Sequence, residues 1–444
     1  MQPTRKVLPG PRTGIAHIPA SKSKAHRLLI MAALSDAPTT LECNGLSNDI
    51  LATINCLKAL GCDITTEDDS LIRVIPLSSA LSGSGDNLKN SDTESTDKLT
   101  PNILPCRDSG STLRFILPLA GVLNAQACFE MEGRLPERPL APYDSELEAH
   151  GMKLRKDGNS LHCEGRLLPG NYTLPGNVTS QYISGLLMSL PFLGGDSTLT
   201  ITGPIESSDY IHITEDVLRL AGIRFTCNNV YDGSDLVYHI PGGQRSQLPD
   251  KLSVESDWSG AAFFLCLGAL SPAGITVRGL NTDSTQGDKA ILDILKRFGA
   301  DISIENDPAD ITVRHSALKG CEIDAAGYPD LVPIIGVIAA AASGTTRIIN
   351  AGRLRLKESD RLKTTAEMLT VLGATVTEGE DSLTIEGRGS LKGGTIDSHD
   401  DHRIAMSAAV AASICDAPVI VTAPECVKKS FADFWEVFEE LGIC

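Results

Sequence analysis

The stretch Pro19-Ala20-Ser21-Lys22-Ser23-Lys24-Ala25-His26-Arg27 runs without a break into the apolar segment 28–34, and the rest of the chain repeats its design. The first turn of a helix leaves backbone N–H groups unpaired and carries a partial positive charge. Lys22, Ser23 and Arg27 add cations and a hydroxyl at such a start, and residues four apart share one helix face. The stretch therefore predicts an anion site, although a solvated helix start would have the same sequence.

A polar turn that leads into a short apolar helix recurs five more times. These turns are Asp108-Ser109-Gly110-Ser111-Thr112-Leu113-Arg114, Val178-Thr179-Ser180-Gln181-Tyr182, Ser256-Asp257-Trp258-Ser259-Gly260, Tyr328-Pro329-Asp330-Leu331-Val332 and His399-Asp400-Asp401-His402-Arg403. After each apolar helix come a strand-like run, a second, amphipathic helix and, in most cases, a strand-turn-strand pattern. Six units of strand, helix, strand, helix, strand, strand therefore fill the chain. We expect the first helix of each unit to be buried, because it is apolar on all sides.

The length of 444 residues exceeds one core and suits two domains of three units each. The last unit ends on its second helix, whereas two short extended runs, 6–8 and 14–18, precede the first unit. We therefore expect these N-terminal strands to form a hairpin-like pair that completes the sixth unit. This assigns residues 20–246 to an N-terminal domain and residues 1–19 plus 247–444 to a C-terminal domain.

The composition disfavours several classes of partner. The net charge is −17, and no basic block or basic stripe with interleaved aromatics is present, which argues against nucleic acid or an acidic membrane. We see no signal-peptide pattern and no apolar run of the roughly 18 residues that span a membrane, so we expect a cytoplasmic protein. The 12 cysteines are scattered without a Cys-x-x-Cys pair, as is typical of reduced thiols.

Several motifs, in order along essentially the whole chain, carry a resemblance to a known family. They are Ser21-Lys22-Ser23 with Arg27, the turn at 108–114, Glu137-Arg138-Pro139, Thr179-Ser180-Gln181, Lys357-Glu358-Ser359-Asp360-Arg361-Leu362 and Asp401-His402-Arg403. Together they resemble the 5-enolpyruvylshikimate-3-phosphate synthase family of enolpyruvyl transferases. The resemblance implies an α/β fold of the α+β type, a two-domain inside-out α/β barrel with six βαβαββ units, three per domain, around a cleft.

The resemblance also implies an activity. The enolpyruvyl group of phosphoenolpyruvate would move to the 5-hydroxyl of shikimate 3-phosphate by addition and elimination, with release of phosphate. This transferase reaction belongs to the shikimate pathway, which makes chorismate and the aromatic amino acids. It implies no metal and no organic cofactor, with these two small molecules as partners, and we expect a monomeric chain.

By the resemblance, two sets of residues bind the substrates. Those for shikimate 3-phosphate are Lys22, Ser23, Arg27, Thr179, Ser180, Gln181, Ser207, Tyr210, Asp330 and Lys357. Those for phosphoenolpyruvate are Lys22, Gly110, Arg138, Gln181, Arg361, Arg403 and Lys429. Hydroxyls and an amide at a helix start suit phosphate oxygens, and a guanidinium suits a carboxylate. As catalytic residues, Asp330 would accept the proton of the attacking hydroxyl, while Lys22 and Glu358 would deliver a proton to the methylene carbon and remove it.

Each motif also has a simpler interpretation when it is taken alone. The turn at 179–181 would be an ordinary helix cap, Gly110 a turn glycine, the cluster at 357–361 an exposed helix start, and Lys428-Lys429 a solvated pair. Three features depart from the family pattern. Arg353 replaces the usual Asn and leaves both Arg353 and Arg355 without a role, Asp108 replaces another Asn as a possible helix cap, and the polar stretch 78–102 predicts a mobile surface loop.

Three other functions stay open. An enolpyruvyl transferase acting on UDP-N-acetylglucosamine shares this fold but typically opens with Lys-x-x-Asn and uses a loop cysteine, a role that the contexts of Cys43, Cys56, Cys62 and Cys106 do not suit. A metal hydrolase site at 399–402 would crowd its ligands in sequence. A non-catalytic anion-binding relative would have lost one of Lys22, Asp330, Glu358 or Arg403, and all four are present.

Overall fold

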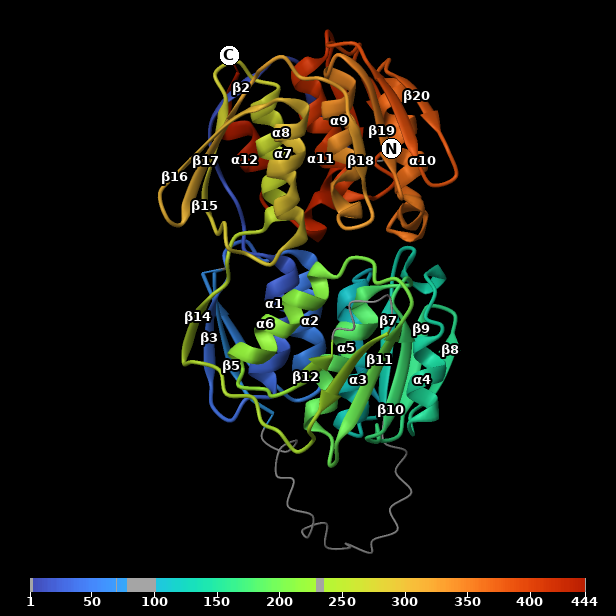
Figure 1. Ribbon diagram of the computed structural model, residues 1–444. Helices are drawn as coiled ribbons and strands as arrows, with labels where there is room; N and C mark the ends of the chain where they lie inside the picture. The colour runs from blue at the N-terminus through green and yellow to red at the C-terminus, as the bar shows by residue number, and fades with distance from the viewer. Residues whose placement is uncertain (1–2, 69, 78–100, 229–234, 444) are drawn as a thin grey trace, which may run out of the picture. The chain divides into compact units, whose positions relative to one another are not determined.

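The computed structural model describes residues 3–68, 70–77, 101–228 and 235–443 as mixed helices and strands (Figure 1). The chain divides into an N-terminal lobe, residues 23–44 and 49–254, and a C-terminal lobe, residues 1–22, 45–48 and 255–444. The chain thus leaves the N-terminal lobe after residue 254, whereas the sequence pattern predicts this boundary at residue 246. The reason is that β14 (Lys251–Ser253) pairs in parallel with β3 (Thr39–Glu42) of the N-terminal lobe.

The three sheets of the N-terminal lobe share one strand order, in which two parallel strands lie side by side and the closing hairpin follows. The first sheet is β14, β3, β5 (Leu71–Ile75) and β4 (Asp63–Glu67). The second is β6 (Asn102–Arg107), β7 (Ala127–Met131), β9 (Ser160–Glu164) and β8 (Lys153–Asp157). The third is β10 (Asn171–Pro175), β11 (Ser197–Thr202), β13 (Leu236–Ile240) and β12 (Thr226–Asn228).

The helices of the N-terminal lobe alternate between buried and amphipathic. The buried first helices are α1 (Lys22–Ala33), α3 (Gly110–Val122) and α5 (Ser180–Ser189). The others are α2 (Asn48–Ala59), α4 (Tyr143–Ala149) and α6 (Asp209–Leu220), with the short helices η1 (Leu135–Glu137) and η2 (Leu190–Phe192). The polar turns act as predicted at α3 and α5, where the N-caps Ser109 and Thr179 accept backbone hydrogen bonds from the first turn. Asp108, by contrast, is not the cap of α3.

The C-terminal lobe repeats the pattern. Its sheets are β16 (Asp301–Glu305), β17 (Ala309–Arg314), β15 (Ile275–Leu280), β2 (Arg12–His17) and β24 (Gly442–Ile443); then β18 (Glu322–Asp324), β19 (Gly344–Ile349), β21 (Leu383–Gly387) and β20 (Thr375–Glu378); then β1 (Thr4–Val7), β23 (Val419–Thr422) and β22 (Gly394–Ile396). Its helices are α7 (Trp258–Ala269), α8 (Ile291–Phe298), α9 (Val332–Ala341), α10 (Arg361–Val371), α11 (His402–Ala411) and α12 (Phe434–Glu440). Short helices are η3 (Gly287–Ala290), η4 (Pro329–Leu331), η5 (Gly352–Leu356), η6 (Ala412–Ile414) and η7 (Pro424–Lys429).

The two N-terminal strands do not form the expected hairpin, and only one of them completes the sixth unit. β1 pairs antiparallel with β23 of that unit, whereas β2 pairs in parallel with β15 and so supplies the first strand of the fourth unit. Residues 442–443, after the last helix, add a short antiparallel strand to β2. The prediction was wrong for β2 because neighbouring extended runs do not reveal which sheet has an open edge.

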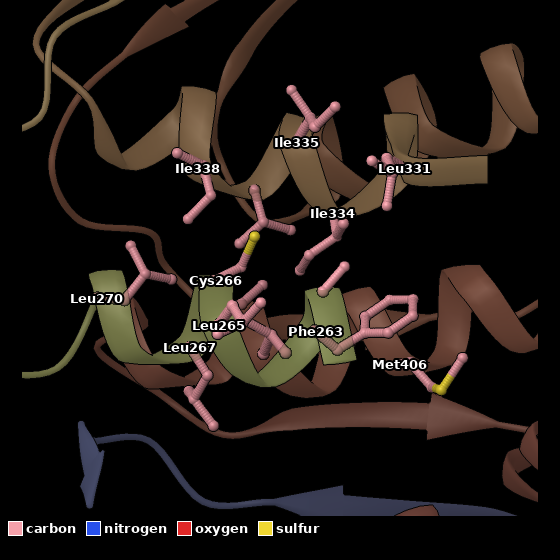
Figure 2. Packing of buried hydrophobic residues seen from close by; sticks show 14 of the residues in the cluster. Phe263, Leu265, Cys266, Leu267, Leu270, Leu331, Ile334, Ile335, Ile338 and Met406 are labelled. Atoms are coloured by element: carbon pink, nitrogen blue, oxygen red, sulfur yellow. The ribbon is translucent and has the colours of Figure 1, made fainter. Parts of the chain in front are cut away.

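The buried first helices form the core of the C-terminal lobe. Figure 2 shows side chains of α7 and α9 facing one another, with Met406 of α11 beside them. Every residue of α9 from Val332 to Ala340 is buried. Burying helices that are apolar all round is the dominant favourable term in the folding of such a lobe, because apolar side chains leave water.

Two further findings concern the sequence predictions. The predicted mobile loop at 78–102 lies outside the described residues up to residue 100, and Asn102 already begins β6. Within the part of the chain that the structure describes, no helix combines the length and apolar character needed to cross a membrane.

Candidate active site

Aspartates mark the starts of all three buried helices in the C-terminal lobe. Asp257 caps α7, Asp401 caps α11, and Asp330 lies in the short helix η4 that leads into α9. Capping places each carboxylate where it accepts hydrogen bonds from unpaired backbone N–H groups. Asp257 accepts from the backbone N–H of Gly260 at 2.8 Å and from that of Lys22, a residue of the same lobe, at 3.0 Å.

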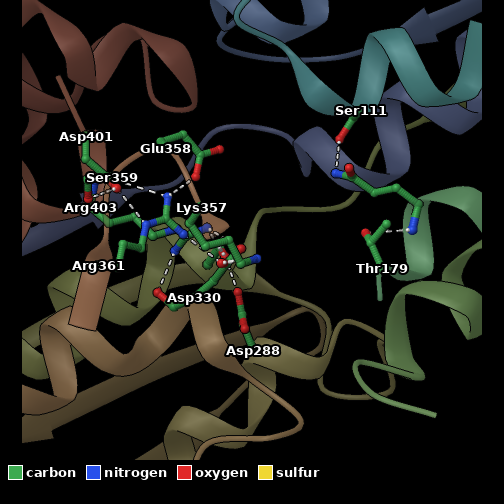
Figure 3. A network of polar contacts seen from close by, with 12 residues as sticks. Ser111, Thr179, Asp288, Asp330, Lys357, Glu358, Ser359, Arg361, Asp401 and Arg403 are labelled. Carbon is green, nitrogen blue, oxygen red and sulfur yellow. Dashed lines mark hydrogen bonds and ion pairs between the residues drawn. The ribbon is translucent and has the colours of Figure 1, made fainter. Parts of the chain in front are cut away.

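Arg361, at the start of α10, joins three carboxylates in this lobe (Figure 3). It donates to both oxygens of Asp401, from Nε at 2.7 Å and from Nη2 at 3.2 Å. It also donates to Glu358 Oε2 at 2.7 Å and to Asp330 Oδ1 at 2.8 Å. Burial lowers the pKa of Arg361, but the three carboxylates outweigh that effect and leave the pKa above its ordinary value. The guanidinium is therefore a fixed positive charge.

Three cationic side chains form ion pairs with Asp330. Lys357 Nζ lies 3.0 Å from Oδ1, Arg361 Nη1 lies 2.8 Å from the same oxygen, and Arg403 Nη2 lies 3.2 Å from Oδ2. Burial favours the neutral carboxyl group, but Arg403, Lys357 and Arg361 hold the pKa of Asp330 well below its usual range. Asp330 is thus ionised at neutral pH and is a weak base while these cations stay on it. Any anion that draws the cations away would raise its basicity.

Two lysines at the end of η7 differ in a way that the sequence did not show. Lys428 is half exposed and pairs with Glu425 at 2.7 Å, whereas Lys429 is buried. The predicted pair is therefore solvated only at its first member. Among the lysines of the site, burial also lowers the pKa of Lys357, although Asp330 opposes that change.

The pH dependence of stability follows from these carboxylates. Burial favours neutral Asp401, but Arg361 and His402 hold the pKa of Asp401 below its ordinary value. A carboxylate with a lowered folded-state pKa stabilises the fold above its unfolded pKa of about 4 and loses that contribution as the pH falls further. We expect the stability difference between the parent and Asp401→Asn to be constant above about pH 5 and to shrink below about pH 4. Tryptophan fluorescence measures this for the C-terminal lobe, because both tryptophans, Trp258 and Trp435, lie there; a difference that grows on acidification would contradict the assignment.

A second polar cluster lies at the starts of α3 and α5 in the N-terminal lobe. Gln181 donates from Nε2 to Ser111 Oγ at 3.0 Å and accepts from Arg114 Nη1 at 2.6 Å. The backbone N–H of Gln181 bonds to Thr179 Oγ1 at 3.3 Å. A Cβ atom built on Gly110 would lie 2.5 Å from Arg114 Nη1 and 2.8 Å from Arg138 Nη1. Two guanidinium groups therefore converge on a helix start that has no side chain, which is a suitable arrangement for an anion.

The guanidinium group of Arg27 is held by hydrogen bonds to other residues of the N-terminal lobe. Its guanidinium donates to Thr214 Oγ1 at 2.7 Å, Ser23 O at 2.6 Å, Ser184 Oγ at 3.1 Å and Tyr210 O at 2.9 Å. The group is 2% exposed and lies 4.8 Å from the ring centre of Phe115. Burial lowers its pKa to about 9. In this structure Arg27 ties α1 to α5 and α6, and its predicted contact with a substrate carboxylate stays a prediction.

The remaining predicted residues divide between the lobes. Ser23, Thr179, Ser180, Ser207 and Tyr210 lie at the helix starts and the α6 approach of the N-terminal lobe, and Ser207 has a positive φ of 54°. Lys22 begins α1 within the C-terminal lobe. The structure thus brings Asp330, Lys357, Glu358, Arg361 and Arg403 into one bonded cluster. It brings Gly110, Arg138 and Gln181 together in the other.

A family model described as EPSP synthase (3-phosphoshikimate 1-carboxyvinyltransferase) matches residues 8–438. The chain belongs to the EPSP synthase family. A protein of Clostridium novyi named 3-phosphoshikimate 1-carboxyvinyltransferase is 41% identical over 449 residues, covering 98% of this chain and 97% of that protein. A protein of the same name from Clostridium kluyveri is 41% identical over 431 residues, covering 97% of this chain and 95% of its own length.

Solved structures agree with this membership. An EPSP synthase from Acinetobacter baumannii aligns with a TM-score of 0.77 at 26% identity, over 100% of this chain and 99% of that chain. The enolpyruvyl transferase NikO from Streptomyces tendae aligns with a TM-score of 0.75 over 100% of this chain and 98% of that chain, and at 19% identity it shows the fold alone. The family and the α/β fold predicted from the motifs are confirmed.

Beside the EPSP synthase motifs, the structure adds residues that sequence reasoning missed. Arg114 stands four residues after Gly110, so helical spacing would have placed it on the same face. The turn at 256–260 placed Asp257 and Ser259 at a helix start, but no local signal marked their contacts, or those of Asp288, with the C-terminal cluster. Arg355, left without a role above, binds Asp360 and Glu378 at 3.0 and 2.8 Å and fixes the loop before α10.

Two of the competing functions lose support. The cysteines considered for the UDP-sugar enzyme are all buried, and burial raises the pKa of Cys43, Cys62 and Cys106 to about 12, which suppresses thiolate chemistry. At the proposed metal ligands 399–402, Asp401 is committed to Arg361, and His399 faces Glu367 at 3.3 Å. Among the described residues there is no group of three or more potential metal ligands.

Proposed function

We propose that this chain transfers the enolpyruvyl group of phosphoenolpyruvate to the 5-hydroxyl of shikimate 3-phosphate and releases phosphate. Membership of the EPSP synthase family supports this activity. It favours shikimate 3-phosphate over a UDP-sugar as the acceptor of the enolpyruvyl group. The observation that carries the proposal is the bonded cluster around Asp330. It contains an ionised carboxylate, a second carboxylate and three cations, as acid–base chemistry on two anionic substrates requires.

The first half of the reaction is an addition. The 5-hydroxyl oxygen bonds to carbon 2 of phosphoenolpyruvate, its proton passes to Asp330, and the methylene carbon gains a proton from Lys22 or Glu358. Substrate anions that share Lys357, Arg361 and Arg403 relieve the charge holding the pKa of Asp330 down, so binding itself strengthens the base. The cations also stabilise the charge of the tetrahedral intermediate.

The second half is an elimination. The methyl carbon returns a proton to Lys22 or Glu358, the carbon–carbon double bond forms again, and the phosphate leaves with the electron pair of the broken carbon–oxygen bond. Arg361 is suited to hold the departing charge, because its own carboxylate partners fix it in place and it needs no rearrangement. We further propose that the protein works as a cytoplasmic monomer.

Phosphate release tests the proposed activity. The purified chain is given phosphoenolpyruvate together with either shikimate 3-phosphate or UDP-N-acetylglucosamine, and released phosphate is measured. We expect turnover with shikimate 3-phosphate only. Turnover with the UDP-sugar, or with neither acceptor, would contradict the proposal, and the second result would favour a non-catalytic anion-binding relative.

Gly110→Ala tests the anion site of the N-terminal lobe. The new methyl group would displace Arg114 and Arg138, because it would lie within 3 Å of both guanidinium groups. We expect the KM for phosphoenolpyruvate to rise about ten-fold, as for the loss of one charge-assisted hydrogen bond. Gly194→Ala is the control in the same lobe, since a Cβ there meets nothing within 4 Å. Equal kinetics for the two variants would remove Gly110 from the site.

A further inference from the structure

Arg403, the first-turn arginine of α11, is held from two sides. Nη1 donates to the backbone carbonyl of Asp330 at 3.0 Å, and Nη2 donates both to Asp330 Oδ2 at 3.2 Å and to Ser259 Oγ at 2.9 Å. A guanidinium has only donors, so the Ser259 hydroxyl must accept from Arg403. Its own hydrogen then needs another acceptor.

That acceptor is Asp288 of η3. Ser259 Oγ donates a hydrogen bond to Asp288 Oδ2, and the Asp288 side chain lies beside the Asp330 network in Figure 3. Asp288 is only 5% exposed. Burial raises its pKa to about 6, while Arg403 opposes that rise. A buried carboxylate therefore reaches Arg403 through one hydroxyl whose orientation it determines.

We propose that Ser259 and Asp288 are positioning residues for Arg403, which keep its guanidinium in place to bind phosphoenolpyruvate. The inference rests on the proposed function, since that function makes Arg403 a ligand of this substrate. When Asp330 accepts a proton, its attraction for Arg403 weakens. The link through Ser259 to Asp288 then still anchors Nη2, so the cation stays aligned through both halves of the reaction.

Kinetics of Ser259→Ala and Ser259→Thr test the link. We expect Ser259→Ala to raise the KM for phosphoenolpyruvate about ten-fold and the KM for shikimate 3-phosphate less than about two-fold, because one hydrogen bond to a charged group is lost. Ser259→Thr keeps the hydroxyl at this half-buried position. It should restore the KM to within about three-fold of the parent. Equal changes in both KM values, or no rescue by threonine, would overturn the proposal.

Asp288→Asn separates positioning from stability. The charged groups facing Asp288 are Arg403, Asp330 and Asp257. The cations on the neighbouring elements have other partners. On α8, Lys296 pairs with Asp293 and Arg297 donates to the carbonyl of Glu322, and on η3 Lys289 donates to the carbonyl of Thr282. A raised carboxyl pKa means that the folded lobe disfavours the ionised form, a cost complete above about pH 6 and absent below about pH 4. Asp288→Asn should therefore melt no lower than the parent at pH 7.5, yet raise the KM for phosphoenolpyruvate. A lower melting temperature with an unchanged KM would show a structural role only.

Crystal structures of the parent and Ser259→Ala, at one pH, make the result independent of turnover. We expect the Arg403 guanidinium to leave its place between Asp330 and residue 259 in the variant. An unmoved guanidinium would overturn the positioning role. If the parent itself releases no phosphate, the proposed function fails, and these structures still decide whether Ser259 places Arg403.

Discussion

Asp330→Ala is expected to lower kcat about a thousand-fold, because a positioned general base typically contributes a factor of about 10² to 10⁴. The aspartate is the only carboxylate of the described cluster that contacts Lys357, Arg361 and Arg403 together. Removing it deletes the proposed proton acceptor and also leaves Lys357 and Arg403 without that counter-charge. Phosphate release under saturating substrates measures the effect.

The control for Asp330 is an aspartate nearby in the same lobe. Asp324 ends β18 and accepts one backbone hydrogen bond, from Ala326 at 3.0 Å. Asp324→Ala should keep kcat within about two-fold of the parent, as exposed substitutions usually do. Tryptophan fluorescence should show that Asp330→Ala still unfolds cooperatively. A folded Asp330→Ala protein with a near-normal rate would refute the role of Asp330 as the base.

Asp401→Ala is expected to destabilise the C-terminal lobe by about 3 kcal/mol, since it removes one partner of a buried charge pair. The Asp401 side chain is fully buried and accepts from Arg361 at 2.7 Å, from Ser359 Oγ at 2.9 Å and from the Arg403 backbone at 3.0 Å. Its loss would leave Arg361 with Glu358 and Asp330 only. Urea unfolding followed by tryptophan fluorescence measures the change in this lobe.

Asp360→Ala provides the matched comparison. Asp360 is also a helix N-cap, at α10, and it also pairs with an arginine, Arg355, at 3.0 Å. Its side chain is 31% exposed, so water can replace both partners. We expect a loss of only about 1 kcal/mol, the usual value for a cap. If the two variants lose equal stability, burial is not the reason for the expected larger contribution of Asp401 to the free energy of unfolding.

Much of the site was predictable because its residues lie in local patterns. Asp330 and Asp401 lie at helix starts that the polar turns predicted. Residues 357–361 follow one another in the sequence, so they could be recognised as one motif. Contacts across the chain were not predictable. The hydrogen bonds of Arg27 to a serine and a threonine side chain and to a carbonyl of α5 and α6 are such contacts, and no pattern near Arg27 in the sequence predicted them.

The amino-acid sequence was enough to predict the six repeated units, their buried first helices and the polar turns at the helix starts. It could do so because hydrophobic period and capping depend on residues within a few positions of one another. Only the tertiary structure decided that β2 belongs to the fourth sheet, and that Ser259 and Asp288 support Arg403. Those pairings join residues far apart in the chain, and which of them form depends on what the folded lobe places within hydrogen-bonding distance.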